Sequence, residues 1–220
     1  MFLIAYVIEK AVKKKNNDTE RVLATRKIVV IGVFSAIAAI LMVLLEFPVP
    51  FAPSFYGLDF SELPALIGAF AYGPVAGVMI EFCKILIKLV LKPSSTAFVG
   101  ELANFSISCM LVLPASVIYL FKKSRKQAIL GTVVGTLIMT AFGSCFNAIY
   151  LLPKFSELYG IPLDAIIGMG TAINPAIHSI SGLVLMCVVP LNLLKGGLVS
   201  LITILVYKKL SPILKAAHKQ

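Results

Sequence analysis

The side chains with the clearest chemical potential in this sequence are two asparagines and a lysine inside long apolar stretches. Asn147 lies in the run CFNAIYLLP, and Asn192 and Lys195 lie three positions apart in VPLNLLKGG. That spacing places Asn192 and Lys195 on one face of a helix. A buried amide without a partner is costly, and a single asparagine in an apolar helix often serves helix packing. Two asparagines and a lysine together favour a pocket for a polar ligand.

A second polar pair, Glu101 and Asn104 in the run VGELANF, lies one turn apart on one side of a helix. The carboxylate and the amide can hydrogen-bond to a neutral, polyhydroxylated ligand. Glu101 can equally serve to oppose the dipole of its own helix N-terminus. The sequence leaves these two interpretations open.

Three charged residues, Glu81, Lys84 and Lys88, share one helical face through spacings of three and seven. Charges within a membrane helix normally face the protein interior or water. This pattern favours a structural Glu81–Lys84 pair with Lys88 extending outward, and a role in coupling or substrate access is the alternative. His178, alone in the run INPAIHS, is expected to form hydrogen bonds in a loop.

Several catalytic and metal-binding patterns are missing from the sequence. There is no G-x-x-x-x-G-K-[ST] loop for ATP and no H-E-x-x-H pair for a metalloprotease. The four cysteines stand singly in apolar runs, which predicts small buried side chains and neither a disulfide framework nor a zinc site. We therefore expect no enzyme activity, no metal and no cofactor.

The elements that position these residues are membrane helices. Of the 220 residues, 59% are hydrophobic and only 14% are charged, with a mean hydropathy of +0.98, values typical of an integral membrane protein. The net charge of +10 comes from basic blocks between apolar runs, so we interpret it as a topology signal and expect no nucleic-acid partner. The predicted spans are 28–47, 75–91, 100–121, 128–150 and 182–207.

A short apolar run at 61–72 is the uncertain element, because a span needs roughly 20 residues. Basic residues cluster before position 28, at 122–126 and after position 207. If all three clusters are cytoplasmic, an even number of crossings separates each from the next, so the short run must cross too. We expect the Gly73-Pro74 pair to make a tight turn after it.

The predicted fold is therefore an all-α integral membrane protein with six transmembrane helices, both termini cytoplasmic and a short second helix. The membrane domain covers 28–210. It follows an N-terminal segment, 1–27, that is either a helix on the membrane surface or a partly disordered cytoplasmic tail, and it precedes a basic cytoplasmic tail at 211–220. Acidic residues are expected at the outer face, where Asp59 and Glu62 at the mouth of the short helix help to form an outward-facing cavity.

Four motifs together resemble one known family. The run FPVPFAPSFYGLDFSELPALIGAFAYGPVAGVMIE, then VGELANF, FNAIYLLP and PLNLLKGGLVSLITILVYKKLSP, is similar to the riboflavin-specific S component of energy-coupling factor (ECF) transporters. The similarity runs from about position 28 to position 214. Only the N-terminal extension lies outside it.

The resemblance implies a bacterial plasma-membrane protein that captures riboflavin from outside and docks on a T component and two ATPases. It also implies that Asn147, Asn192 and Lys195 contact the flavin. Gly32 and Ala36 match the small residues, spaced by four, through which the first helix of such proteins approaches the T component, although glycine stands where the family usually has alanine. Binding of flavin mononucleotide is left open.

Other functions remain as rivals. An S component for another vitamin or for a pyrimidine precursor uses the same machinery. A flavin-dependent membrane enzyme and a scaffold protein belong to different classes. A bound ligand that is released intact, with no turnover, distinguishes the S component from both.

Overall fold

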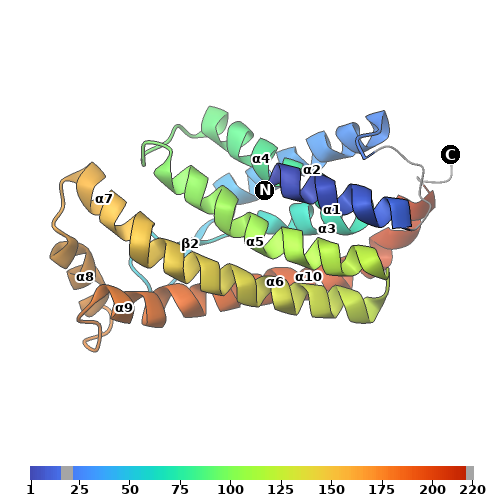
Figure 1. The fold of residues 1–220 in the computed structure, drawn as a ribbon. Coiled ribbons are helices and arrows are strands. Elements are labelled where there is room, and N and C mark those ends of the chain that lie inside the picture. The colour runs from blue at the N-terminus through green and yellow to red at the C-terminus, as the bar shows by residue number, and fades with distance from the viewer. Residues whose placement is uncertain (16–21, 217–220) are drawn as a thin grey trace.

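The fold is a bundle of helices packed side by side along one direction, seen in a computed structural model that describes residues 1–15 and 22–216 (Figure 1). Two short strands are the only β-structure in this described part. In chain order the elements are α1 (Phe2–Lys15), α2 (Thr25–Leu44), β1 (Phe47–Pro48), β2 (Gly57–Leu58), α3 (Glu62–Tyr72), α4 (Pro74–Leu91), α5 (Val99–Phe121), α6 (Arg125–Phe146), η1 (Asn147–Leu151), α7 (Leu152–Tyr159), α8 (Leu163–Thr171), α9 (Ile180–Leu183), η2 (Val184–Val188) and α10 (Val189–Ala216).

Four of the helical segments in the described part are long and apolar enough to cross a membrane: Thr25–Leu44, Val99–Phe121, Arg125–Tyr159 and Ile180–Tyr207. These correspond to four of the five long spans expected from the sequence. The fifth, α4, is helical from Pro74 to Leu91 as expected, but it carries three charged residues. The structure thus confirms the predicted all-helical architecture, with four helices long and apolar enough to span a membrane.

The short run at 61–72 is a helix, α3, and it lies in the centre of the bundle. Its 11 residues are nearly all buried, because α2, α4, α5 and α10 all pack against it. A helix enclosed by protein does not need the length that lipid contact demands. The turn after α3 also forms as predicted: Gly73 has φ 102°, which favours glycine, and Pro74 begins α4.

Small residues on α2 form two separate stripes. Ser35 and Ala39 are fully buried, on the side of α2 that packs against α4 and α3. Gly32 and Ala36 are exposed on the adjoining, outward part of the helix surface, and a Cβ atom added at Gly32 would meet nothing within 4 Å. Because the side chains of the outward stripe are small, the backbone of another helix can come close to α2 on the outside of the bundle.

The N-terminal segment forms a helix that packs on the bundle. Within α1, Ala5, Glu9, Val12 and Lys13 are buried against α4 and α5. Glu9 accepts a hydrogen bond of 3.0 Å from the backbone N–H of Val75, at the start of α4, where a carboxylate opposes the helix dipole. Of the two interpretations of this segment, the structure favours a helix over a partly disordered tail for 1–15, while 16–21 lie outside the described residues.

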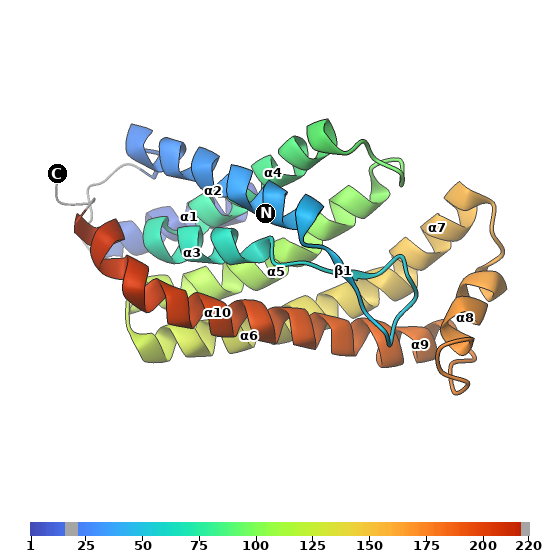
Figure 2. The same cartoon turned by 180° about the vertical axis from the view of Figure 1, so that it is seen from behind.

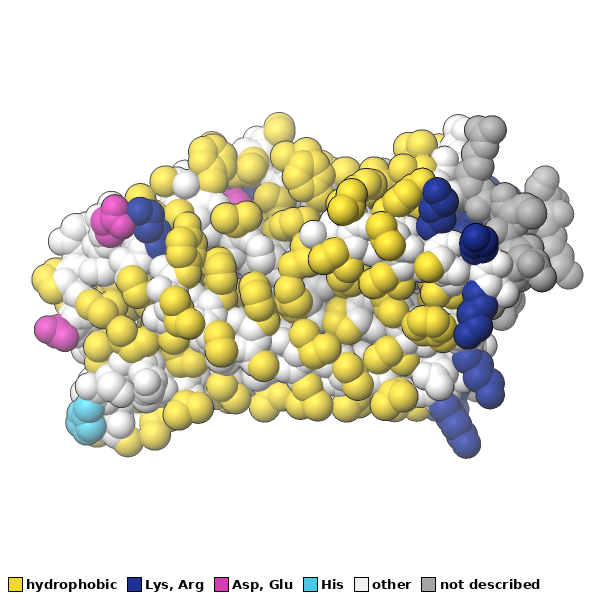
Figure 3. All heavy atoms as spheres, in the orientation of Figure 1, with side chains coloured by type: hydrophobic (Ala, Val, Ile, Leu, Met, Phe, Trp, Pro, Cys, Tyr) yellow, Lys and Arg dark blue, Asp and Glu magenta, His cyan; other side chains and the backbone are white. Residues whose placement is uncertain are grey.

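The charged surface residues gather at the two ends of the bundle, and an apolar belt lies between them (Figure 3). Lys122, Lys123, Arg125, Lys126 and Lys209 are exposed at one end. The exposed acidic residues Glu157 and Asp164 belong to α7 and α8, at the other end. Arg21 and Lys219, which the sequence assigned to the basic clusters, lie outside the described residues.

Two acidic residues that were expected at the outer surface are inside the protein. Asp59 and Glu62 are 4% and 1% exposed. The segment that carries Asp59 includes β1 and β2, which pair antiparallel, and it crosses from α2 to the side of α10 before α3 begins (Figure 2). This crossing brings Asp59 over the interior of the bundle.

The cysteines are free thiols, as predicted, but not all of them are buried. Cys109 and Cys187 lie in the core, Cys83 is half-buried, and Cys145 is exposed. The expectation that all four are buried is wrong for Cys145, which lies on the outer side of α6.

Candidate functional site

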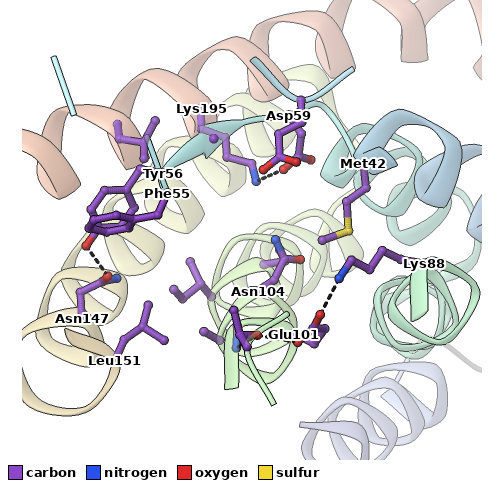
Figure 4. Close-up of a pocket in the computed structure, with 18 of the residues that line it drawn as sticks. Met42, Phe55, Tyr56, Asp59, Lys88, Glu101, Asn104, Asn147, Leu151 and Lys195 are labelled. Atoms are coloured by element: carbon purple, nitrogen blue, oxygen red, sulfur yellow. Dashed lines mark hydrogen bonds and ion pairs between the residues drawn. The ribbon is translucent and has the colours of Figure 1, made fainter. Parts of the chain in front are cut away.

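A cavity of about 300 Å³ lies among α2, α3, α4, α5, η1 and α10, beneath the segment that contains β1 and β2. All five residues that the sequence singled out for ligand binding line it: Glu101, Asn104, Asn147, Asn192 and Lys195. Asp59 and Glu62 line it as well. Figure 4 shows the labelled members pointing toward one another across the open space. The volume suits a small organic ligand.

Two π-helical turns shape the wall of the cavity near Asn147 and Asn192. η1 begins at Asn147, and η2 ends four positions before Asn192. Each turn is followed two residues later by a proline, Pro153 or Pro190. Proline lacks an N–H and disturbs the regular hydrogen-bond ladder, and single π turns in α-helices are often found at functional sites.

Both polar atoms of the Asn147 side-chain amide form hydrogen bonds within the protein. Its Oδ1 accepts a hydrogen bond of 2.8 Å from the Tyr56 hydroxyl, and its Nδ2 donates to the Gly143 carbonyl at 2.8 Å. Burial raises the pKa of the Tyr56 phenol, with a smaller contribution from Cys187, so the hydroxyl remains a donor. A ligand that hydrogen-bonds to the amide of Asn147 must share or replace these contacts.

Two buried amide atoms in the cavity wall have no protein partner. They are Nδ2 of Asn192, which is a donor, and Oδ1 of Asn104, which is an acceptor. A buried polar atom without a partner costs roughly 1–3 kcal/mol. A ligand that supplies one acceptor and one donor would satisfy both atoms.

Lys195, in the cavity wall, forms ion pairs with two carboxylates. Its Nζ lies 3.0 Å from Asp59 Oδ2 and 2.8 Å from Glu62 Oε1. Burial alone would raise the pKa of Asp59, but the Lys195 and Lys84 ammonium groups hold it down at about 2. Asp59 is therefore ionised at neutral pH, and Lys195 shares its charge with two carboxylates.

The Glu81–Lys84 pair forms as predicted, whereas Lys88 does not extend outward. Lys84 lies 2.6 Å from Glu81, and both side chains are fully buried. Lys88 pairs with Glu101 at 2.5 Å across the cavity edge. The expectation for Lys88 is wrong because the buried carboxylate of Glu101 lies within its reach.

Glu101 organises the loop before α5. Its Oε2 accepts hydrogen bonds from Ser94 Oγ at 2.8 Å and Thr96 Oγ1 at 2.9 Å. In this loop Ala97 and Phe98 have positive φ values of 47° and 67°, a conformation that costs energy for residues other than glycine. The structure thus gives Glu101 protein partners on both oxygens, and a ligand contact at Glu101 stays a prediction.

Sequence reasoning missed several residues of the cavity. Tyr56, Ser108 and Phe155 line it, and nothing in their local sequence distinguishes them from packing residues. Spacing along one helix cannot reveal contacts between segments that meet only in the fold. His178 is exposed in the loop between α8 and α9 and is not part of the cavity.

A family model matches residues 26–207 of the chain, and its description is "ECF transporter, substrate-specific component". The match leaves out α1. It includes the whole of the cavity described above.

Individual relatives agree with this match. The riboflavin transporter RibU of Staphylococcus aureus is 33% identical over 190 residues, which cover 86% of this chain and 93% of the relative. The riboflavin transporter FmnP of Bacillus subtilis is 32% identical and covers 85% and 93%. The solved S component of a bacterial ECF transporter superposes with a TM-score of 0.67 at 34% identity, over 87% of this chain and 98% of that chain.

Proposed function

Because this chain belongs to the family of substrate-specific components of ECF transporters, we propose that it binds riboflavin in the cavity at Asn192 and Lys195. Two relatives that share about a third of their residues with this chain carry the name riboflavin transporter. As a transport component it is not an enzyme, and riboflavin is its cargo rather than a cofactor.

The observation that carries the proposal is the pair of unsatisfied amide atoms in the cavity wall. Asn192 Nδ2 offers a donor and Asn104 Oδ1 offers an acceptor. The imide edge of a flavin ring presents carbonyl acceptors beside an N–H donor, which is the complementary set. The flat ring also suits the apolar side chains of Met42, Leu151 and Val188 in the same cavity.

We also propose a topology of six crossings, formed by α2, α3, α4, α5, α6–α7 and α9–α10, with both termini in the cytoplasm. Most of the basic side chains visible in Figure 3 gather at one end of the bundle, and this end is cytoplasmic by the positive-inside rule. The cavity then lies toward the outer side, where a ligand arrives. The buried position of α3 allows 11 residues to serve as one of the crossings.

Energy for uptake comes, in this proposal, from a T component and two ATPases on which the chain docks. The sequence has no ATP-binding loop of its own. The exposed stripe of Gly32 and Ala36 is the proposed docking surface, because small residues allow helix backbones to approach closely in lipid.

The experiment that tests the function is ligand identification followed by titration. The protein is purified in detergent from cells grown with riboflavin, and released small molecules are identified by mass spectrometry. The stripped protein is then titrated with riboflavin, flavin mononucleotide and unrelated vitamins, with quenching of flavin fluorescence as the readout. Saturable riboflavin binding supports the proposal, whereas folded protein that leaves riboflavin fluorescence unchanged refutes it.

A further inference from the structure

Lys195 belongs to a buried cluster of five charged residues, Asp59, Glu62, Glu81, Lys84 and Lys195. Every member is buried or nearly so, with side chains between 0% and 12% exposed. The cluster contains three carboxylates and two ammonium groups. The pocket lysine therefore stands in surroundings that supply more negative charge than positive charge.

Within this cluster the two lysines have different tasks. Lys84 pairs with Glu81 at 2.6 Å and donates to Ser61 Oγ at 2.9 Å, while Glu62 is farther from it at 3.7 Å. Lys195 is the nearer partner of Glu62 at 2.8 Å, and it also contacts Asp59 at 3.0 Å. Ser108 donates to Glu62 Oε1 at 2.7 Å, which fixes that carboxylate further.

Lys195 donates one hydrogen bond, to Asp59 Oδ2 at 3.0 Å, and Glu62 Oε1 lies 2.8 Å from the same nitrogen as an ion-pair partner. An ammonium group carries three donors and no acceptor, so these two contacts leave at least one donor for a ligand. Both carboxylates are themselves held in place by other groups. Asp59 accepts a hydrogen bond of 2.8 Å from the backbone N–H of Ser61, which anchors its side of the contact.

We propose that Asp59 and Glu62 are positioning residues that convert Lys195 from an anion-binding group into a single directed hydrogen-bond donor for an uncharged carbonyl. An unpaired buried lysine would attract anions, since charge interactions are strong away from water. With two carboxylates about 3 Å from its ammonium group, the positive charge of the lysine is compensated, and the cluster as a whole repels an anionic ligand group. This inference rests on the proposed function and adds that the cavity requires the uncharged ring edge of a flavin at Lys195, with any phosphate kept away from it.

The test compares the purified full-length protein with the variants Asp59→Asn, Glu62→Gln and Asp59→Asn/Glu62→Gln. Each substitution keeps the size and an acceptor oxygen but removes one negative charge. Riboflavin affinity is measured by fluorescence quenching, and the visible absorption spectrum of bound riboflavin reports hydrogen bonding to the ring. Sulfate is then added as a competitor at constant ionic strength, with a bulky organic anion as the balancing salt.

We expect each single variant to bind riboflavin about tenfold more weakly, a loss typical of one charge-assisted hydrogen bond, and to shift the flavin absorption bands. In the double variant sulfate should compete with riboflavin, because Lys195 then lacks its counter-charges. In the wild type sulfate should have no effect. Glu157→Gln, which removes an exposed carboxylate paired with Lys154, is the matched control and should behave as the wild type.

The outcomes separate the inference from the proposed function. If the folded wild type binds no riboflavin, the function is wrong. If the wild type binds but Asp59→Asn and Glu62→Gln keep its affinity and spectrum, or sulfate fails to compete in the double variant, the positioning role is overturned. Should Glu62→Gln fail to fold, Asp59→Asn decides by the same affinity and spectrum measurements.

Discussion

The hydroxyl of Tyr56 donates a 2.8 Å hydrogen bond to Oδ1 of Asn147, which lies 91 positions later in the chain. The contact joins the segment that covers the cavity to the π turn in its wall. It also occupies the amide oxygen that the sequence assigned to the ligand. The amide of Asn147 thus has protein partners for both of its polar atoms, whereas Asn192 Nδ2 and Asn104 Oδ1 have none.

The first prediction concerns Tyr56→Phe. The change leaves the buried Oδ1 of Asn147 without its donor, so thermal stability without ligand should fall, by roughly 1–3 kcal/mol. Riboflavin affinity should hold or rise, because a flavin N–H can then satisfy this oxygen. Thermal unfolding in detergent and fluorescence titration measure the two effects, with Tyr150→Phe as the control. A strong loss of affinity would instead mean that the Tyr56 hydroxyl contacts the ligand.

The second prediction contrasts the two asparagines. Asn192→Ala should weaken riboflavin binding by roughly 1–3 kcal/mol without lowering stability, because Asn192 Nδ2 has no protein partner to lose. Asn147→Ala should lower stability as well, because it removes two hydrogen bonds within the protein. Parallel titration and unfolding of both variants provide the measurement. Unchanged affinity in Asn192→Ala contradicts the site.

The third prediction concerns topology. In a variant without native cysteines, Asp164→Cys should react with a membrane-impermeant thiol reagent on intact cells, whereas Lys123→Cys should react only after lysis. Both positions are exposed, unlike Asp59, which is buried and unsuitable for labelling. Reaction of Lys123→Cys on intact cells would rule out the six-crossing arrangement.

The fourth prediction separates docking from binding through the two stripes of α2. Gly32→Leu and Ala36→Trp place bulk on the exposed stripe, so riboflavin binding should survive while ATP-dependent uptake and co-purification with the transport module are lost. Val133→Trp, at an exposed position on α6, is the control and should keep uptake. Ala39→Leu, on the buried stripe, should instead destabilise the fold, by about 1–3 kcal/mol. Normal uptake in both outer variants would place the docking surface elsewhere.

The fifth prediction concerns pH. The positive charges of Lys195 and Lys84 outweigh the effect of burial and lower the pKa of Asp59 from 3.8 to about 2. A carboxyl group whose pKa is lower in the folded state than in the unfolded state stabilises the folded protein. This contribution is fully present above about pH 4 and is lost as the pH falls toward 2. Asp59→Asn should therefore reduce this acid-dependent part of the unfolding free energy and leave the profile between pH 5 and 8 unchanged in shape. Identical acid profiles for the two proteins would contradict the ion pair.

The sequence by itself was sufficient for the membrane class, the positions of the long helices and the turn at Gly73. Each of these depends on local properties, namely apolar length, the placement of basic residues and the backbone preferences of glycine and proline. It was also sufficient to bring Asn192 and Lys195 together, because a spacing of three residues determines a shared helical face. The short helix at 61–72 was correctly identified as an element from its apolar pattern.

The tertiary structure alone decided the partners of these residues. Lys195 and Asp59, which pair in the fold, are 136 positions apart in the chain. Nothing in the sequence around either residue indicates that the other is its partner. The same holds for Lys88, whose predicted outward extension followed from its own helix alone, because its partner Glu101 lies on the next helix, α5. Side chains far apart in the chain meet only because helices pack, so their hydrogen bonds and charge balance depend on the whole bundle rather than on any segment of it.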